Sequence, residues 1–429
     1  MMNEDFLHFL WKKQLLGTDL LLGTQKEKIR ILDPGEMNND AGPDFFNAQI
    51  KIGEQLWAGN VEIHIKSSDW FLHNHEQDKA YDNVILHVVW EHDTDVYRKD
   101  NTTIATLVLK DLVNKEVLNN YEKLFLIPIA IGTNKWINCE HDFKEVDNFI
   151  LNNWLERLYI ERLERKAKAI EVLLKESKND WEAVLFKMLA KNFGLKVNGE
   201  SFFSLAQSID FSIIRKTQSK QHVLEALLFG QAGLLEFDIE DGYYLSLVNE
   251  YKFLTQKFNL KNTQVLPIQF FRLRPANFPT IRLSQLASLY NVKQNLFSKI
   301  IKTEDLNEFY DLFEVATPEF WNTHYTFQKE SKASKKRVTK SFVDLLLINT
   351  ILPIKFCYAK HQGVEVDISI LKIANAMTSE RNSIIDAFNN LKTVSKSSLD
   401  SQALIQLKTE YCDKNKCLQC AIGYSLLNK

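Results

Sequence analysis

The sequence predicts an α+β protein, in which a small N-terminal α/β module precedes a large and mostly helical region. Glycine and proline are scarce, with 14 Gly and 8 Pro in 429 residues. These counts lie well below the averages of about 7% and 5%, which argues against a loop-rich or all-β protein. Strand-like hydrophobic patterns occur before about residue 110, and helical patterns dominate after about residue 145. The 45% apolar and 25% charged fractions are typical of a folded, soluble protein.

The N-terminal module begins with an amphipathic helix over residues 3–16 and continues with strands. Turn signals such as Asp33-Pro34-Gly35 separate the strand candidates. The candidates are Lys28–Leu32, Phe45–Ile52, Leu56–Ile65, Val84–Trp90 and Ile104–Leu109. The run VILHVVW at residues 84–90 is almost wholly apolar, as expected of a strand that is buried on both faces. A polar helix or turn over residues 69–80 precedes this strand, so helix, three strands, helix and strand follow in order.

From about residue 145 the hydrophobic period becomes helical, as in the run Leu151, Trp154, Leu155 and Leu158. Further helix candidates share this pattern: Trp181–Phe193, Gln221–Phe229, Tyr243–Phe258, Leu283–Tyr290, Glu304–Phe313 and Ser341–Ile351. The basic run Lys329–Lys340 predicts a solvated linker or loop. We therefore expect two domains, residues 1–140 and residues 141–429, with the C-terminal cysteines in the second.

The net charge of −2 conceals an uneven distribution. Residues 1–100 contain ten Lys and Arg but eighteen Asp and Glu, so they carry −8 and the remainder carries +6. Six of the ten histidines also fall in the first hundred residues. Carboxylates and imidazoles gather where a cation is bound, and basic surfaces attract polyanions. The alternative is a pair of solvated surfaces without a ligand, which is equally common.

The sequence favours a cytoplasmic protein without membrane association. The start, MMNEDFLHFLWKKQ, lacks the basic and apolar regions of a signal peptide. The longest apolar stretch, Leu345–Ala359, is interrupted by Pro353 and Lys355 and is too short to span a bilayer. Five Cys do not make a disulfide scaffold in a chain of this length, so we expect reduced thiols. The sequence has no P-loop, Rossmann fingerprint or G-x-S-x-G elbow, so these chemistries are unsupported.

Two acidic residues in the N-terminal module are positioned to share a metal. Asp44 lies at the beginning of one predicted strand, and Glu62 lies in the middle of the next, hairpin-paired strand. Two carboxylates on adjacent strands can converge on one hard divalent cation. The strand period places His64 on the same face as Glu62, within reach of a metal-bound water, and Lys66 lies two residues further along that face. The alternative is a twisted hairpin whose polar face is only solvated.

The segment with Pro43-Asp44, followed by Glu62 and His64, resembles the PD-(D/E)XK nuclease superfamily, which has a restriction-endonuclease-like core. The order of elements over residues 3–110 also resembles that core. The resemblance implies that Asp44 and Glu62 hold Mg²⁺ or Mn²⁺ and that the protein hydrolyses phosphodiester bonds of nucleic acid. His64 stands where the family has a lysine. The alternative implied by this departure is an inactive nuclease fold that binds nucleic acid or protein.

Other histidines follow the hairpin. His73 and His75 come after Ser67-Ser68-Asp69-Trp70, and His87 lies inside the apolar strand, where its ring must find a partner. His87 is either a satisfied core histidine or part of the same site. A third hypothesis is therefore a metalloenzyme that uses His73, His75 and His87 as transition-metal ligands on a substrate other than nucleic acid.

Three of the five cysteines are concentrated near the C-terminus. Cys412, Cys417 and Cys420 form C-x4-C-x2-C, a spacing used for Fe–S clusters and Zn²⁺. Cys139 is the preferred candidate for a fourth ligand, and His141 and Cys357 are alternatives. The arrangement resembles the metal clip of some helicase-linked PD-(D/E)XK nucleases. Reduced structural thiols are the other interpretation.

The helical region offers a candidate nucleic-acid contact. Arg272, Arg274 and Arg282 stand near aromatic residues and prolines, a combination suited to phosphate contacts. The alternative is a surface loop with ion-paired arginines. The stretches DPGEMNNDAGPDFFNAQI, GNVEIHIKSSDW and AYDNVILHVVW also resemble an uncharacterised bacterial family known only as a domain of unknown function. That resemblance extends over most of the chain and implies no activity.

Overall fold

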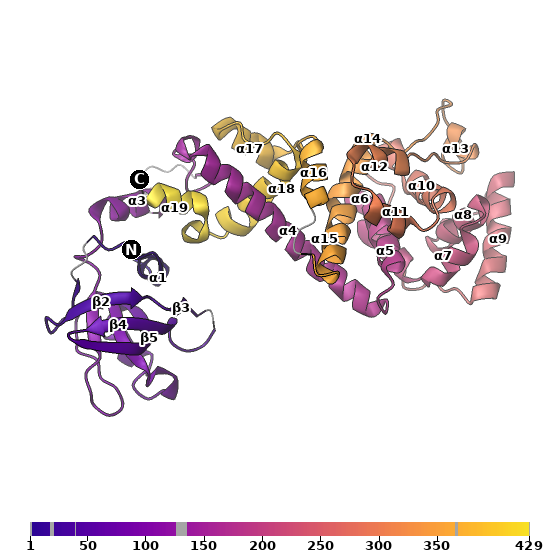
Figure 1. Cartoon of the computed structure of the whole chain (residues 1–429). Coiled ribbons are helices and arrows are strands. Elements are labelled where there is room, and N and C mark those ends of the chain that lie inside the picture. The colour runs from indigo at the N-terminus through magenta and orange to yellow at the C-terminus, as the bar shows by residue number, and fades with distance from the viewer. Residues whose placement is uncertain (1, 18–20, 39, 126–134, 365–367, 429) are drawn as a thin grey trace. The chain divides into compact units, whose positions relative to one another are not determined.

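A computed structural model of the protein describes residues 2–17, 21–38, 40–125, 135–364 and 368–428 (Figure 1). Its internal contacts divide the chain into two compact units. Unit 1 comprises Met1–Trp154, Asn390–Lys392 and Leu407–Lys429, and unit 2 comprises Leu155–Asn389 and Thr393–Gln406. The α+β class is confirmed, because a sheet region is followed by a large helical region. The units differ from the two predicted domains, because the C-terminal cysteine segment packs with the N-terminal module rather than with the helical region.

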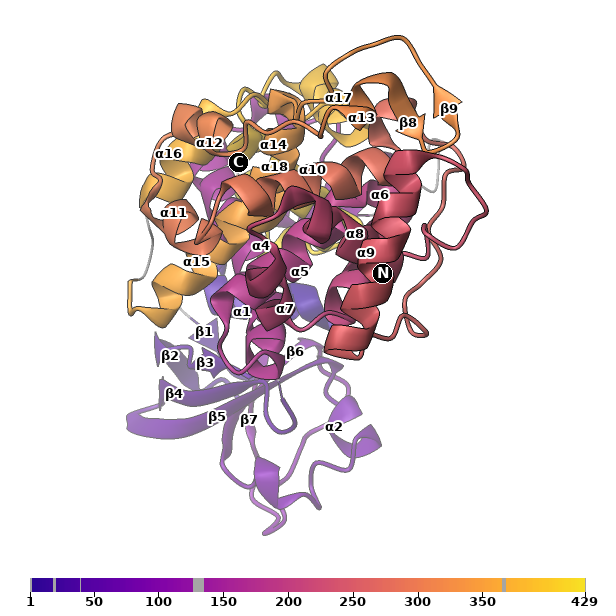
Figure 2. The same ribbon diagram turned by 90° about the vertical axis from the view of Figure 1, so that its right-hand side faces the viewer.

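Unit 1 is built around a mixed sheet with the strand order β1-β2-β4-β5-β6-β7, and β3 pairs with β4 (Figure 2). The strands are β1 (Leu21–Leu22), β2 (Lys28–Asp33), β3 (Glu36–Met37), β4 (Phe45–Ile52), β5 (Gln55–Lys66), β6 (Val84–Glu91) and β7 (Ala105–Val108). Strands β4 and β5 form an antiparallel hairpin, whereas β5, β6 and β7 run parallel to one another. The predicted strands are therefore present, and each of their ends coincides with the predicted end or differs from it by one residue.

Strand β5 carries the residues that matter for the site. Its alternate residues Val61 and Ile63 are buried on one face of the sheet, and Glu62 and His64 are buried on the other. In the parallel register of β5 with β6, Glu62 is paired with His87, so the two side chains share a face. Upstream, a Cβ at position 59 would overlap the Ile85 side chain and the Asn83 carbonyl oxygen, so glycine permits the close approach of β6.

The helices of unit 1 are α1 (Glu4–Lys13), α2 (Asp69–Leu72), α3 (Lys115–Phe125) and α19 (Ala421–Leu427), and α4 (Asn148–Glu176) begins there. Helix α1 packs against β5, and its aromatic face is buried. The C-terminal helix α19 lies beside α3, which Figure 1 shows in yellow and purple. The ring of Phe9 on α1 also meets Tyr424 on α19, with centroids 5.8 Å apart. Both ends of the chain thus contribute to unit 1.

Unit 2 is helical apart from a small hairpin. Its helices, in addition to most of α4, are α5 (Trp181–Phe193), α6 (Leu195–Gln207), α7 (Phe211–Thr217), α8 (Gln221–Gln231), α9 (Gly242–Phe258), α10 (Pro279–Val292), α11 (Leu296–Lys302), α12 (Leu306–Leu312), α13 (Phe320–Thr323), α14 (Lys340–Leu346), α15 (Leu352–His361), α16 (Ile368–Ala376), α17 (Ser383–Leu391) and α18 (Ser398–Gln406). The predicted basic linker or loop is mostly irregular, although its first two residues form β9 (Lys329–Glu330), which pairs with β8 (His324–Thr326). Lys336 from that run is buried, and its Nζ donates to the Asn322 carbonyl oxygen.

One helical stretch among the described residues, Lys340–His361, is long and apolar enough to cross a membrane, and about two-thirds of its apolar window (67%) is buried inside the protein. Lys355 in this stretch is buried, and its Nζ donates to the carbonyl oxygens of Ile301 and Thr303 at 2.9 Å each. The lysine thereby satisfies acceptors at the end of α11. Most of this apolar stretch therefore belongs to the core of unit 2.

Candidate metal centre

Two carboxylates converge on the hairpin of β4 and β5. Asp44 immediately precedes β4, and its backbone N–H donates to Glu62 Oε2 at 3.1 Å. In return, Asp44 Oδ2 accepts from the backbone N–H of Ile63 at 2.9 Å. The hairpin register, which pairs Phe45 with Val61, brings these groups side by side. The reciprocal hydrogen bonds fix the two acidic residues that the sequence singled out.

Histidines gather around the Glu62 carboxylate. His75 Nε2 lies 3.2 Å from Glu62 Oε1, and His64 Nε2 lies 3.5 Å from the same oxygen. His73 Nδ1 is 3.1 Å from His64 Nε2. One ring nitrogen from each of the three histidines lies within 4.8 Å of the others. This spacing is compatible with coordination of one ion, because an ion about 2.1 Å from each nitrogen draws the nitrogens to within about 4 Å of one another.

A short helix and a left-handed turn present His73 and His75. His73 caps the C-terminal end of α2, and Asn74 adopts the left-handed conformation with φ of 59°. The backbone N–H of His75 then donates to the Trp70 carbonyl oxygen at 3.1 Å. The sequence predicted a polar helix or turn over residues 69–80, and α2 with the turn that follows it occupies the first part of that range. This turn brings together two rings that would diverge on a continuous helix.

His87 lies fully buried beside His64 and belongs to the same site. Its Nε2 is 2.9 Å from His64 Nδ1. When His64 Nδ1 carries the proton and donates it to His87, the His64 Nε2 lone pair is left facing His73 and Glu62. An outer histidine that fixes a ligand's tautomer in this way is a recurrent feature of metal centres. His87 Nδ1 has no hydrogen-bond partner among the described residues.

Burial dominates the electrostatics of the cluster. Burial lowers the pKa of His64 to about 3, and the nearby His75 and His73 add to this effect. Burial likewise lowers the pKa of His87 well below its usual value. Burial raises the pKa of Glu62, and hydrogen bonding to His75 opposes that rise. The two buried imidazoles are therefore neutral, which is the form of histidine that binds metals.

The structure adds two residues that sequence reasoning missed. His8 on α1 lies 3.2 Å from Asp44 Oδ2 through its Nε2. Burial would lower the pKa of His8, but the hydrogen bond and charge of Asp44 outweigh burial and raise it. The Tyr81 ring stacks on His75, with centroids 3.7 Å apart. The position of His8 on an amphipathic helix was the available signal, but no local pattern indicates which strand that helix covers.

The remaining predicted residues occupy different environments. Lys66 is exposed at the end of β5, where its backbone N–H donates to Asp69 Oδ2. Arg272 and Arg274 are exposed in unit 2. Arg282 is only 7% exposed, and its guanidinium bonds Asn277 and Gln285, so it offers no free surface to a phosphate. The prediction of phosphate contacts therefore rests on Arg272 and Arg274.

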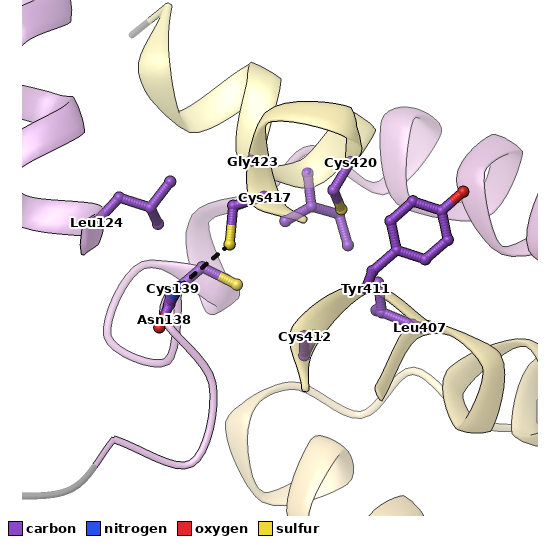
Figure 3. Close-up of a pocket in the computed structure, with 10 residues that line it drawn as sticks. Leu124, Asn138, Cys139, Leu407, Tyr411, Cys412, Cys417, Cys420 and Gly423 are labelled. Atoms are coloured by element: carbon purple, nitrogen blue, oxygen red, sulfur yellow. Dashed lines mark hydrogen bonds between the residues drawn. The ribbon is translucent and has the colours of Figure 1, made fainter. Parts of the chain in front are cut away.

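The four cysteines predicted to act together line one cavity in unit 1. Cys139, Cys412, Cys417 and Cys420 come from two segments that are far apart in the sequence (Figure 3). The alternative ligand Cys357 lies in unit 2 and is buried in α15. The cysteine cavity and the histidine cluster share no residue that lines or builds them.

Residues 4–383 match the model of a family described as "Protein of unknown function (DUF2851)". No curated protein and no solved structure matches the chain.

Proposed function

Because the chain belongs to the DUF2851 family, whose function is unknown, we propose its activity from the site itself: unit 1 is a metal-dependent hydrolase that cleaves phosphodiester bonds of nucleic acid. One observation carries this proposal. Asp44 and Glu62 converge on one hairpin, the imidazoles of His64 and His75 lie within 3.5 Å of Glu62, and His73 lies beside these two rings. Neighbouring carboxylates and neutral imidazoles are the groups that bind a divalent ion.

The donor set fits a transition metal better than Mg²⁺. Mg²⁺ prefers oxygen ligands in a near-ideal octahedron, whereas imidazole suits transition ions such as Zn²⁺ and Fe²⁺ and carboxylate also suits Mn²⁺. Glu62, His64, His73 and His75 would hold the ion, with Asp44 as a further carboxylate. Bound there, such an ion polarises water and offsets the negative charge that builds up on a phosphate. Of the two ions that the sequence suggested, Mn²⁺ is therefore the better fit.

The residues around the ligands have supporting roles. His87 fixes the ring of His64 from the buried side, and His8 on α1 lies within ion-pair distance of Asp44. Nucleases of the PD-(D/E)XK superfamily have a lysine at the position that corresponds to His64. In our proposal, the ring lone pair of His64 binds the metal or accepts a proton, and His64 supplies no positive charge. Lys66 is exposed at the end of the same strand, where its ammonium would contact a phosphate.

A second candidate function is a metalloenzyme that acts on a substrate other than nucleic acid. The observation that favours it is the spacing of His64, His73 and His75, which is typical of a transition-metal site of any reaction class. The two candidates share the metal and differ in the substrate. Cleavage of nucleic acid therefore discriminates between them, whereas metal binding alone does not.

The test combines metal binding with cleavage. Mn²⁺ binding is measured by calorimetry, and cleavage of single- and double-stranded DNA and RNA is then measured with Mn²⁺ present. We expect the Asp44→Ala, Glu62→Ala double variant to lose Mn²⁺ binding and to lose at least about 100-fold in cleavage rate. The matched control is Glu54→Ala, which removes an exposed carboxylate from the turn of the same hairpin. The control variant retains both properties.

Three outcomes contradict parts of the proposal. Cleavage that persists in the double variant places the active site elsewhere. Mn²⁺ binding without cleavage of any nucleic acid contradicts the proposed nuclease activity and favours the second candidate function or a binding module. If the protein binds none of Mn²⁺, Zn²⁺ and Fe²⁺, the proposal of a metal centre is itself contradicted.

A further inference from the structure

Four buried or half-buried cysteines surround one cavity in unit 1, away from the histidine cluster. Cys139 follows α3 in the sequence, and Cys412, Cys417 and Cys420 come from the C-terminal segment. Figure 3 shows the four residues around a common space. None of them forms a disulfide. The rest of the lining includes the apolar Leu124, Leu407 and Ile422 together with Asn138 and Tyr411.

The backbone around the cavity is shaped to present these sulfurs. Cys417 begins a short 3-10 turn, Cys417–Gln419, and Cys420 caps the N-terminal end of α19. A Cβ on Gly423 of α19 would overlap the Cys417 carbonyl oxygen, so glycine lets this turn lie against the helix. The Asn138 side-chain amide donates to Cys417 Sγ at 3.4 Å and to Asn415 Oδ1 at 3.3 Å. The amide thereby joins the two segments that carry the cysteines.

The polar groups at this cavity point to a ligand. The indole N–H of Trp154 is buried and has no hydrogen-bond partner among the described residues. The Trp154 ring meets Tyr411, which lines the cavity, with centroids 5.4 Å apart, and its N–H faces Cys420 without the geometry of a normal hydrogen bond. A buried, unpaired N–H costs about 1–3 kcal/mol, and a thiolate or sulfide acceptor would remove this cost.

We propose that Cys139, Cys412, Cys417 and Cys420 bind an iron–sulfur cluster. Four cysteine ligands are the usual complement of such a cluster. Among the described residues, no three of these sulfurs lie within 4.8 Å of one another. One tetrahedral Zn²⁺, with Zn–S bonds of about 2.3 Å, draws its sulfurs to within about 4 Å of each other. A cluster of several irons holds its thiolates further apart, and its sulfides accept hydrogen bonds from groups such as the Trp154 indole.

The cluster would fasten the C-terminal segment to the N-terminal module. Helix α19 contacts α3 and also the turn that carries Cys417. The Tyr424 ring of α19 meets both Phe9 and Lys13 of α1. The same helix α1 carries His8, which bonds Asp44. Loss of the cluster is therefore expected to loosen α19 first, and the elements that it contacts next.

The test begins with the unmodified full-length protein, purified without oxygen. Iron, acid-labile sulfide and zinc are quantified, and the visible absorption spectrum is recorded. We expect iron and sulfide in similar amounts, with a charge-transfer band that dithionite bleaches. Hydrogen exchange of α19 is measured before and after the cluster is removed by a chelator and an oxidant, and we expect it to accelerate after removal.

Variants then assign the ligands. Cys417→Ser is expected to lose most of the iron and the visible band, whereas the matched control Cys357→Ser, at a buried thiol in unit 2, retains both. Trp154→Phe keeps the packing and removes the N–H, so it is expected to retain iron and to lower the reduction potential of the cluster. This variant keeps the proposal testable if Cys417→Ser does not fold.

Two outcomes overturn the proposal. Zinc near one equivalent without iron identifies a single-ion site instead of a cluster. Absence of both metals, with all five thiols titrating as free cysteines in the unfolded protein, identifies structural thiols only. Neither outcome affects the proposed hydrolase, whose site lies on other residues.

Discussion

His64 is bonded on both sides of its ring, through Nδ1 to His87 and through Nε2 to His73. Its burial leaves the ring neutral. A lysine at this position would have to place an ammonium among three other imidazoles without water, which is costly. The surroundings of position 64 therefore suit a neutral imidazole better than an ammonium. At the residue scale, position 64 presents the lone pair of a ring nitrogen rather than a positive charge.

Replacement of His87 tests this view. His87→Phe keeps a buried ring in β6 but removes the hydrogen bond to His64 Nδ1. Loss of such an outer partner lowers metal affinity about 10- to 100-fold in characterised sites, so we expect the Mn²⁺ dissociation constant to rise by that factor. Calorimetry measures the change. His92→Ala, which removes a half-exposed histidine from the segment after β6, is the control and leaves the constant unchanged. An unchanged constant in His87→Phe would mean that His87 only fills the core.

Glu225 in α8 provides a second residue-scale prediction, which concerns stability. It is 1% exposed and accepts from the Tyr243 hydroxyl at 2.6 Å and from the Trp321 indole at 3.0 Å. Burial raises its pKa from 4.5 to about 7. The folded state thus binds more protons than the unfolded state between these values, so the free energy of unfolding is greatest below pH 4.5 and falls as pH rises through 7.

The expected loss is about 3 kcal/mol between pH 4.5 and pH 8, because one pKa unit corresponds to about 1.4 kcal/mol. Glu225→Gln has no charge to bury and should lack this component. Urea unfolding of both proteins at pH 5 and pH 8, followed by helical circular dichroism, measures the difference. Equal pH dependence in the two proteins would show that Glu225 ionises without cost.

At the scale of elements, α1 matters because it carries His8. The Asn3 side chain caps this helix by accepting from the Phe6 N–H at 3.0 Å, and the Tyr121 hydroxyl of α3 donates to the same oxygen at 3.1 Å. Asn3→Ala removes both bonds, so we expect a loss of about 1 kcal/mol in the free energy of unfolding of unit 1. Thermal and urea unfolding measure it. Asn3→Asp retains an acceptor and should recover most of the loss, whereas a loss of equal size in both variants would argue against the cap.

Elements with strong local patterns were predictable. The strand Phe45–Ile52 and the helix Trp181–Phe193 have the predicted bounds. Helix α6 was missed because Asn198, Gly199 and Ser201 have low helix propensity, and only burial of Phe202 and Leu205 against the rest of unit 2 stabilises it. Tertiary packing overrode propensity there. No window of local sequence contains that information.

In the site, too, residues placed by local patterns were predictable, whereas residues placed by tertiary packing were not. The hairpin spacing predicted Asp44, Glu62 and His64, because strand period and turn position are local. His73 and His75 converge only through a left-handed turn at Asn74, a conformation that sequence permits but does not require. His8 and His87 depend on which elements pack together, and this is a property of the whole chain.

At the scale of the whole molecule, the chain returns to its N-terminal module at its end. The predicted domain boundary at residue 140 separated the C-terminal cysteines from that module, whereas residues 407–429 belong to unit 1. The spacing of Cys412, Cys417 and Cys420 indicated a cluster, and Cys139 was the preferred partner. Cys139 and the C-terminal cysteines are more than 270 residues apart in the sequence. The hydrogen bond from Asn138 to Cys417 shows that their segments nevertheless lie together. Sequence distance of this kind is why the domain assignment differed.

The most direct test of the central claim is anomalous diffraction from crystals of the protein soaked in Mn²⁺, recorded for the wild type and for Glu62→Ala. The predicted result is one anomalous peak within bonding distance of Glu62, His64 and His75 in the wild type, with no peak there in the variant. A wild-type map without a peak at these residues, or a peak that survives in Glu62→Ala, would contradict the metal centre on which the proposed hydrolase rests.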